Sequence, residues 1–371
     1  MKIFRRREKA TPLAGTASQA KLVWSKFKRH RVAIAGGIVV LLFYLTTIFA
    51  EFLAPHNPYL RDTTMLFAPP MGIHLWDEQG TFSFPFAYSL NHTLDMERFE
   101  RTYTVDKTRK NTLRFFVRGD SYKLWGLWET DLHLFSVEGA SRVYLLGTDK
   151  LGRDLLSRII YASRISLSIG LVGITISFGL GIVLGAVSGY FGGIIDIVIQ
   201  RIIEVLMCIP SLPLWMALSV AIPFSWPLIW VFFSITVILS FMGWTGIARV
   251  VRGKLISLRE EEFVIAARLD GVKTARVMFK HMLPSFTSHL IATATLSIPG
   301  MILGETALSF LGIGLRAPAI SWGVLLQSAQ NIEAVAITPW LLLPGVAVVV
   351  VVLAFNFFGD GLRDAADPYT E

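Results

Sequence analysis

The chain has 371 residues, of which 53% are hydrophobic and only 17% are charged, and its formal net charge is +8. This composition excludes an ordinary soluble enzyme, and several apolar runs reach the roughly 20 residues that a membrane-spanning helix needs. The basic excess does not indicate nucleic-acid binding, because it is concentrated in residues 1–31, where ten Lys or Arg stand against one acid. Basic residues directly before an apolar run are typical of a cytoplasmic N-terminus, so we expect a multi-pass membrane protein with no nucleic-acid partner.

The first two predicted elements are a helix on the membrane surface and a helix through the membrane. Lys21–Arg31 is basic and amphipathic, and we expect Trp24 and Phe27 to rest on membrane lipid. The first membrane helix is predicted over 32–50. That run is too long for the apolar part of a secretory signal, so we interpret it as a retained anchor.

Residues 51–160 cannot lie in a membrane and are predicted to form an external insert. The only cysteine, Cys208, allows no intrachain disulfide, so the insert must be held by its own core. We expect a small mixed α/β domain whose short apolar runs, bounded by Gly or Asp, form strands over 112–117, 122–128, 131–137 and 142–146. Its tryptophans are interpreted as core or subunit-interface residues, with ligand stacking as the alternative: Trp76, Trp125 and Trp128.

Five more membrane helices are predicted within 161–371, over about 163–189, 197–221, 227–248, 286–304 and 339–358. Gly181 and Gly185 form a GxxxG pair that permits close packing, within this chain or onto a partner. Six spans that start inside place both termini in the cytoplasm, together with a loop over 249–285. The Lys and Arg residues in that loop agree with this topology.

Two small groups of residues stand out at the predicted helix ends. The first is expected to brace the external mouth, with docking of a binding protein as the alternative: Asp149, Gly152, Arg153 and Asp154. The second is a candidate path or gate, because proline kinks membrane helices and a buried carboxylate is costly: Pro210, Pro213, Pro299 and Glu305. Glu305 either pairs with a basic neighbour or lines the path.

Catalytic motifs are not found. The sequence has no GxxxxGK[ST] nucleotide loop, no HExxH or other metal-ligand spacing, and no serine elbow. We therefore expect neither an enzyme nor a bound metal or cofactor.

The polar stretch Arg259–Pro284 lies between two apolar runs. Its acidic start suits a helix N-terminus, and Gly271 is expected to end a short helix. The residues expected on its apolar face are Val264, Ala267, Leu269 and Val272. A polar helical loop between membrane spans needs a contact outside the bilayer, so we predict that it docks on another protein.

This stretch resembles the cytoplasmic loop of ABC importer permeases, E-A-A-x3-G-x9-I-x-L-P. The matching positions are Ala266, Ala267, Gly271, Leu283 and Pro284, whereas Ile265 replaces the Glu and His281 replaces the first Ile. A His there is common in the dipeptide/oligopeptide/nickel branch. Four further segments look like the C-type permease of that branch: Leu146–Leu167, Gly189–Arg201, Leu308–Gly323 and Asn356–Pro368.

The resemblance implies an all-α membrane protein with the six-helix fold of type I ABC importers (MetI-like) in a bacterial cytoplasmic membrane. The implied partners are a homologous B-type permease subunit, two ABC ATPase subunits that hydrolyse ATP with Mg, and an external substrate-binding protein. The implied cargo is di- or oligopeptides, with oligosaccharides or nickel as alternatives. The residues implied to couple to the ATPases are Glu262, Ile265, Ala266, Ala267, Asp270, Gly271, Leu283 and Pro284.

Two rival hypotheses belong to other classes. A self-contained secondary transporter predicts inverted repeats and ionisable residues at the membrane midplane, which the sequence does not clearly show. A membrane-anchored receptor whose insert is the functional domain leaves 259–284 without a role.

Overall fold

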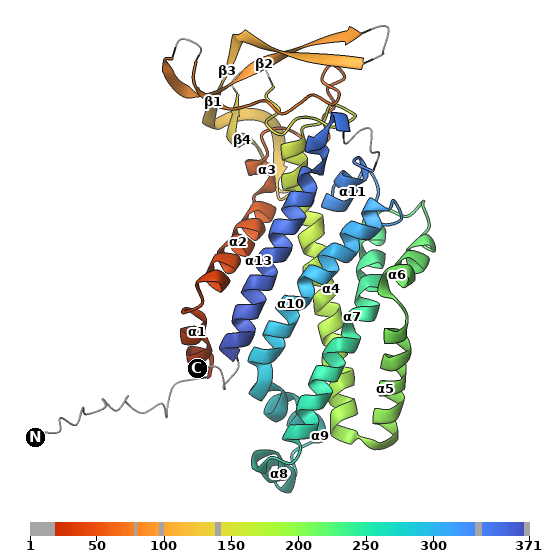
Figure 1. Cartoon of the computed structure of the whole chain (residues 1–371). Helices are drawn as coiled ribbons and strands as arrows, with labels where there is room; N and C mark the ends of the chain where they lie inside the picture. Colours follow the sequence, from red (N-terminus) through yellow and green to blue (C-terminus); the bar gives the residue numbers. More distant parts are fainter. Residues whose placement is uncertain (1–18, 78–79, 96–99, 138–141, 331–335, 367–371) are drawn as a thin grey trace, which may run out of the picture.

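A computed structural model describes residues 19–77, 80–95, 100–137, 142–330 and 336–366. Within these ranges five helices are long and apolar enough to cross a membrane, or six if one sharply bent pair counts as a single span. The five are α2 (Arg31–Ile48), α4 (Leu155–Phe191), α7 (Leu228–Leu258), the continuous helical run Thr274–Phe310 that contains α10 (Thr287–Phe310), and the run Pro339–Ala366 that contains α13 (Leu343–Ala366). They lie side by side as one bundle (Figure 1).

Small residues set the closest helix contacts. A Cβ atom added to Gly185 of α4 would lie 2.5 Å from the carbonyl oxygen of Ala248 on α7. One added to Gly36 of α2 would lie 2.7 Å from the carbonyl oxygen of Ala354 on α13. Gly181 and Gly185 therefore pack helices together within this chain, which decides between the two expectations for the GxxxG pair.

The bent pair consists of α5 (Gly193–Cys208) and α6 (Ser211–Val220), which meet at 87°. Pro210 stands directly before α6 in an extended conformation, with φ −58° and ψ 128°. Pro213 lies in the first turn of α6, where a backbone N–H has no partner within the helix. The predicted interruption is confirmed at Pro210 alone. Pro299 lies inside α10, which continues through it from Thr287 to Phe310.

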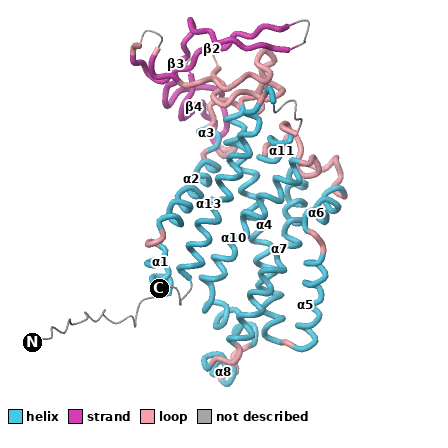
Figure 2. Tube along the Cα trace, in the orientation of Figure 1, coloured by secondary structure: helices cyan, strands magenta, loops and turns pink. Residues whose placement is uncertain are grey.

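A four-stranded antiparallel sheet covers one end of the bundle, opposite the short helix α8 (Glu262–Leu269; Figure 2). Its strands are β1 (His74–Trp76), β2 (Phe82–Asp95), β3 (Glu100–Leu124) and β4 (Trp128–Val137), in that order across the sheet. The long β3 pairs with β2 through its first half and with β4 through its second half.

The insert differs from the prediction in four respects. The strand predicted over 122–128 is interrupted, because β3 ends at Leu124 and a turn leads to β4 at Trp128. Between α3 (Ala50–Leu53) and α4 the described residues form strands and loops but no helix, so the helical part of the predicted α/β insert is limited to its two ends. The run 142–146 is a loop, and its Val143 and Tyr144 are buried in the core of the sheet domain. β1 and β2 were not predicted, although β2 places Phe82, Phe84, Phe86, Tyr88 and Leu90 at every second position, a spacing typical of a strand.

The three tryptophans of the insert are not core residues. Trp76, Trp125 and Trp128 are 61%, 47% and 60% exposed. Trp125 instead donates its indole N–H to the carbonyl oxygen of Ile48 at the end of α2, at 2.7 Å.

The end of the bundle near α8 also departs from the prediction. Helix α7 continues to Leu258, so the loop predicted over 249–285 begins ten residues later, at Arg259. Helix α1 (Gln19–Phe27) is present as expected. However, Phe27 is buried against Phe358 with their rings edge to face, and does not lie on a membrane surface.

Candidate functional site

Helix α8 lies at the end of the molecule farthest from the sheet (Figure 1). Glu261 is its N-cap and Glu262 lies in its first turn, where negative charge favours the helix dipole. The helix ends at Leu269, and the N–H of its C-cap residue Asp270 bonds to the carbonyl oxygen of Ala266 at 2.9 Å. Gly271 follows with φ +71°, the left-handed conformation that commonly closes a helix. The predicted helix and its glycine stop are therefore confirmed.

Two apolar side chains attach α8 to the core of the bundle. Val264 is fully buried and Ala267 is 8% exposed, and both belong to the main core cluster with Val277 and Met282. Leu269 was expected on the same face but is 83% exposed. It lies five residues after Val264, which at about 100° per residue places it roughly 140° around the helix.

The outer face of α8 is apolar although it is uncovered. Phe263 and Ile265 are 44% and 45% exposed, beside Leu269 and the exposed Ala266. A single short helix that presents apolar side chains outward is typical of a docking element, because such groups gain free energy when a partner covers them.

The coupling residues suggested by the sequence fall into two places. Six lie together on α8 and its C-terminal cap: Glu262, Ile265, Ala266, Ala267, Asp270 and Gly271. Ala267 among them faces the core and not the outer surface. Leu283 and Pro284 begin a 3-10 turn on the helical run that leads into α10.

Polar contacts beside α8 hold the neighbouring helices, and the sequence did not reveal them. The Arg268 guanidinium lies 4.8 Å from the ring centroid of Tyr190, and its Nε donates to the Tyr190 hydroxyl at 3.1 Å. At the turn between α4 and α5, Arg252 of α7 donates two hydrogen bonds of 2.5 Å to Asp196. These partners are 56 to 78 residues apart, so spacing gives no signal.

At the sheet end, the residues predicted to brace the mouth do lie together. Arg153 donates to the buried Asp149 at 2.7 Å, and the Nε atom of Arg158 lies 3.6 Å from the same carboxylate. Asp154 caps α4 by accepting the Ser157 N–H at 2.8 Å, and burial raises the pKa of its carboxyl. This arrangement fits the bracing interpretation.

Gly152 closes this cluster. Its φ is +70°, and an added Cβ atom would lie 1.8 Å from the carbonyl oxygen of Asp62. Neither the backbone conformation nor the space admits a side chain, so the loop requires glycine there.

A second ion pair at this end joins α3 to α4. Arg164 contacts both carboxylate oxygens of Glu51, which is only 6% exposed. Bidentate pairing of this kind holds a guanidinium and a carboxylate in one geometry. Residue spacing does not indicate this pair, because the partners are 113 residues apart.

Glu305 is fully buried and follows neither of the two expectations. Its carboxylate accepts hydrogen bonds from three serine hydroxyls, those of Ser166 (3.2 Å), Ser309 (2.8 Å) and Ser321 (2.7 Å). No basic side chain pairs with it within the described part of the chain, and it lines no open path there. It instead links α4, α10 and the segment before α11 (Trp322–Gln327).

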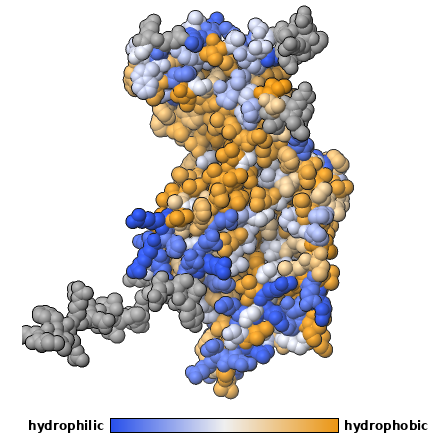
Figure 3. Space-filling view, in the orientation of Figure 1, coloured by the Kyte–Doolittle hydropathy of each residue, from blue (hydrophilic) through white to orange (hydrophobic). Residues whose placement is uncertain are grey.

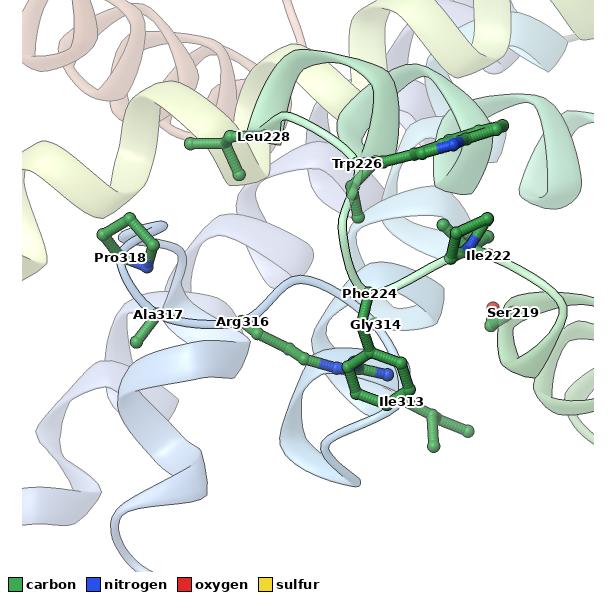
Figure 4. Close-up of a pocket in the computed structure, with 12 residues that line it drawn as sticks. Ser219, Ile222, Phe224, Trp226, Leu228, Ile313, Gly314, Arg316, Ala317 and Pro318 are labelled. Carbon is green, nitrogen blue, oxygen red and sulfur yellow. The ribbon is translucent and has the colours of Figure 1, made fainter.

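A cavity of about 150 Å³ lies between the α6–α7 connection and the loop after α10 (Figure 4). The Arg316 guanidinium lies 3.6 Å from the ring centroid of Phe224, which connects the two loops across the cavity. The described residues hold no group of three or more His, Cys, Asp or Glu placed to bind a metal ion.

Comparison with known proteins gives a consistent result. The family described as binding-protein-dependent transport system inner membrane component matches residues 181–371, and the N-terminal TM domain of oligopeptide transport permease C matches residues 18–70. The dipeptide transport system permease protein DppC of Bacillus subtilis is 30% identical over 93% of this chain and 84% of that protein. DppC of Alkalihalophilus pseudofirmus is 39% identical over 62% of this chain and 74% of that protein.

A solved structure of the MetNI methionine ABC transporter in inward-facing conformations is also similar. The identity is 19%, the TM-score is 0.46, and the match covers 57% of this chain and 98% of that one.

Proposed function

This chain belongs to the family of binding-protein-dependent transport system inner membrane components, and we propose that it forms half of the path of an ABC importer for di- and oligopeptides. It is a permease subunit and not an enzyme, since ATP hydrolysis in such importers is performed by separate subunits. The peptide cargo is proposed because the relatives are named as dipeptide and oligopeptide permeases.

The observation that carries the coupling proposal is the apolar outer face of α8. We assign this face as the contact for a cytoplasmic ABC ATPase, which uses ATP and Mg. Val264 and Ala267 anchor α8 in the core and Arg268 holds it to Tyr190, so the helix can follow a moving partner while only these few contacts change. Gly271 lets the chain leave α8 at a sharp angle and return toward the bundle.

The remaining partners and the topology follow from this placement. With α8 in the cytoplasm, the sheet lies outside the bacterial cytoplasmic membrane, where an external substrate-binding protein delivers cargo. Both termini are then cytoplasmic, which agrees with the basic N-terminus. A homologous B-type permease subunit would complete the path, and the bend at Pro210 and the cavity beside Phe224 are its candidate moving parts on this chain.

The test replaces one exposed apolar side chain at each end of the molecule by aspartate. Leu269→Asp places a charge on the outer face of α8, and Phe84→Asp does so on β2, where Phe84 is 71% exposed. We expect the Leu269 variant to lose co-purification of the ATPase and ATP-driven peptide uptake while it still inserts in the membrane. The Phe84 variant should retain the ATPase. Normal ATPase binding by Leu269→Asp would refute the assignment.

A reconstituted importer also separates this proposal from an ion-driven transporter. Uptake should require ATP and the ATPase subunits. Uptake by the chain alone on an ion gradient would favour the rival.

A further inference from the structure

A groove of about 640 Å³ lies between the upper end of α2 and the β3–β4 hairpin. Its volume falls within the roughly 300–1,000 Å³ of pockets that take small ligands. One wall is formed by α2, Phe49 and α3, with Leu42, Leu45, Thr46, Phe49, Phe52 and Leu53, and the hairpin contributes Tyr122, Leu124, Thr130 and Leu132. The two walls are far apart in the sequence and meet where α3 and β4 adjoin (Figure 1).

The groove is lined mainly by apolar side chains and offers a ligand little polar surface. Its three hydroxyl-bearing residues are already engaged inside the protein. Thr46 donates to the carbonyl oxygen of Leu42 at 2.9 Å, Tyr122 donates to the carbonyl oxygen of Leu132, and Thr130 accepts the Leu132 N–H at 3.4 Å. A ligand that fits this surface is therefore apolar along the part that enters, because a polar group would lose its hydrogen bonds to water there.

The tip of the hairpin carries uncovered aromatic and aliphatic side chains. Leu127 is 73% exposed and Trp128 is 60% exposed, and the Trp128 ring meets that of Trp125 at 5.7 Å. Trp125 is fixed to the last residue of α2 by its hydrogen bond to Ile48 and lies 6.0 Å from the Phe49 ring. Tryptophan with its N–H engaged and its ring uncovered is typical of the membrane–water interface.

The backbone supports this placement. Of the described residues, three that are not glycine have positive φ, and two of them are aromatic residues of this region, Phe116 (φ 56°) and Trp125 (φ 54°). Bulky residues avoid this conformation, so local contacts must hold them in it. The ring centroid of Phe116 lies 6.2 Å from that of Phe52, and Trp125 bonds to Ile48. Phe116 and Trp125 are therefore both directed toward the end of α2 and α3.

We propose that the β3–β4 hairpin dips into the outer leaflet and that the groove holds the acyl chain of a membrane lipid. The groove continues the exposed face of α2, where Leu41, Leu42 and Leu45 are 58%, 55% and 40% exposed. On the face drawn in Figure 3, hydrophobic surface likewise extends from the helices onto the adjoining part of the sheet domain. The inference rests on the proposed placement of α2 in the membrane with the sheet outside.

The single native cysteine makes the test specific. In the full chain with Cys208→Ser, one cysteine is introduced at a time and labelled with an environment-sensitive fluorophore. Leu127→Cys reports on the tip and Thr130→Cys on the groove. Leu41→Cys marks the membrane helix. Val105→Cys is the matched control, an apolar residue of β3 that is 55% exposed and belongs to the β2–β3 arm farther from the helices.

The labelled chains are reconstituted in phosphatidylcholine vesicles with or without bromine atoms on the acyl chains. We expect brominated lipid to quench the labels at 127 and 130 as strongly as the label at 41, and to leave the label at 105 unchanged. If the label at 41 is quenched but the labels at 127 and 130 are not, this inference is refuted while the membrane placement of α2 stands. That conclusion is the same whether the unquenched labels lie in water or beneath another protein. Equal quenching at 105 would also overturn it. Absence of quenching at 41 would overturn both this inference and the membrane placement behind it.

Discussion

The two ends of the bundle are held by different kinds of interaction. At the sheet end, buried charges hold the structure: the Asp149–Arg153–Arg158 cluster fixes one short stretch before and at the start of α4, and the Glu51–Arg164 pair joins α3 to α4. At the α8 end, one short helix is attached to the core by Val264 and Ala267 and presents its other apolar side chains outward. Ion pairs and hydrogen bonds require one geometry, so they favour a rigid arrangement at the sheet end. In contrast, a helix attached to the core by two apolar side chains can move more easily with a partner.

Two glycines with the same backbone conformation offer the largest contrast. Gly152 and Gly271 have φ of +70° and +71°, but an added Cβ atom would strike the Asp62 carbonyl oxygen in the first case and meet nothing within 4 Å in the second. We expect Gly152→Ala to lower the free energy of unfolding by about 4 kcal/mol or more, because strain and a backbone clash add. Thermal unfolding in detergent measures this loss. A melting temperature close to wild type would contradict the rigid mouth.

The next effect concerns a buried ion pair. Arg164→Ala leaves the Glu51 carboxylate buried without its partner, and we expect a loss of about 3 kcal/mol, the lower end for such pairs because Arg164 is partly exposed. Adding Glu51→Gln should restore part of the stability by removing the unpaired charge. The control is Arg201→Ala in the exposed Arg201–Glu204 pair, where about 1 kcal/mol or less is expected. Equal losses of stability in Arg164→Ala and Arg201→Ala would contradict a larger contribution from the buried pair.

Gly271→Ala should have a small effect on stability and a large one on coupling. The cost is about 1–2 kcal/mol of backbone strain, since the site has room for a methyl group. Relief of that strain would reorient α8, so peptide uptake per ATP hydrolysed should fall while membrane insertion persists. Measurements of uptake and ATPase rate on the same preparation decide the question, and unchanged coupling would exclude a role for this turn.

The smallest predicted effect is a dependence of stability on acid. Burial alone would raise the pKa of Asp62, but hydrogen bonds from Thr64 and Tyr144 outweigh it and place the pKa below the ordinary value of 3.8. The ionised carboxylate therefore contributes stability above that value, and the contribution is lost as the pH falls through the lowered pKa. Asp62→Asn should be less stable than wild type at neutral pH by under about 1 kcal/mol, and the difference should vanish in strong acid. Melting curves from neutral pH into strong acid, past the lowered pKa, test this, and a difference that persists where the carboxyl is protonated in both states would exclude Asp62 as its cause.

The membrane helices were predictable because long apolar runs need no knowledge of their neighbours. The ends of these helices were less predictable. The last turns of α7 carry Arg249, Arg252 and Lys254, which resemble a loop in the sequence but extend the helix beyond the apolar run. Leu269 was assigned to the wrong face of α8. In a helix of only eight residues, too few apolar positions repeat to show which way each of them faces.

Long-range polar contacts were the least predictable part of the molecule. Glu305 attracted notice as a carboxylate in an apolar run, yet its partners are uncharged serines from three separate segments. Serine occurs throughout the chain, so no local pattern indicates which hydroxyls converge. In contrast, Gly271 was placed correctly, because the end of a short helix depends on residues a few positions away.

The bend between α5 and α6 has a practical consequence. Cys208 is exposed and is the last residue of α5, so the native sequence places its one thiol beside the 87° break. The rate at which a thiol reagent modifies the unmutated protein therefore reports how open that corner is. Recorded during turnover, the same rate would follow the corner in time without any engineered probe.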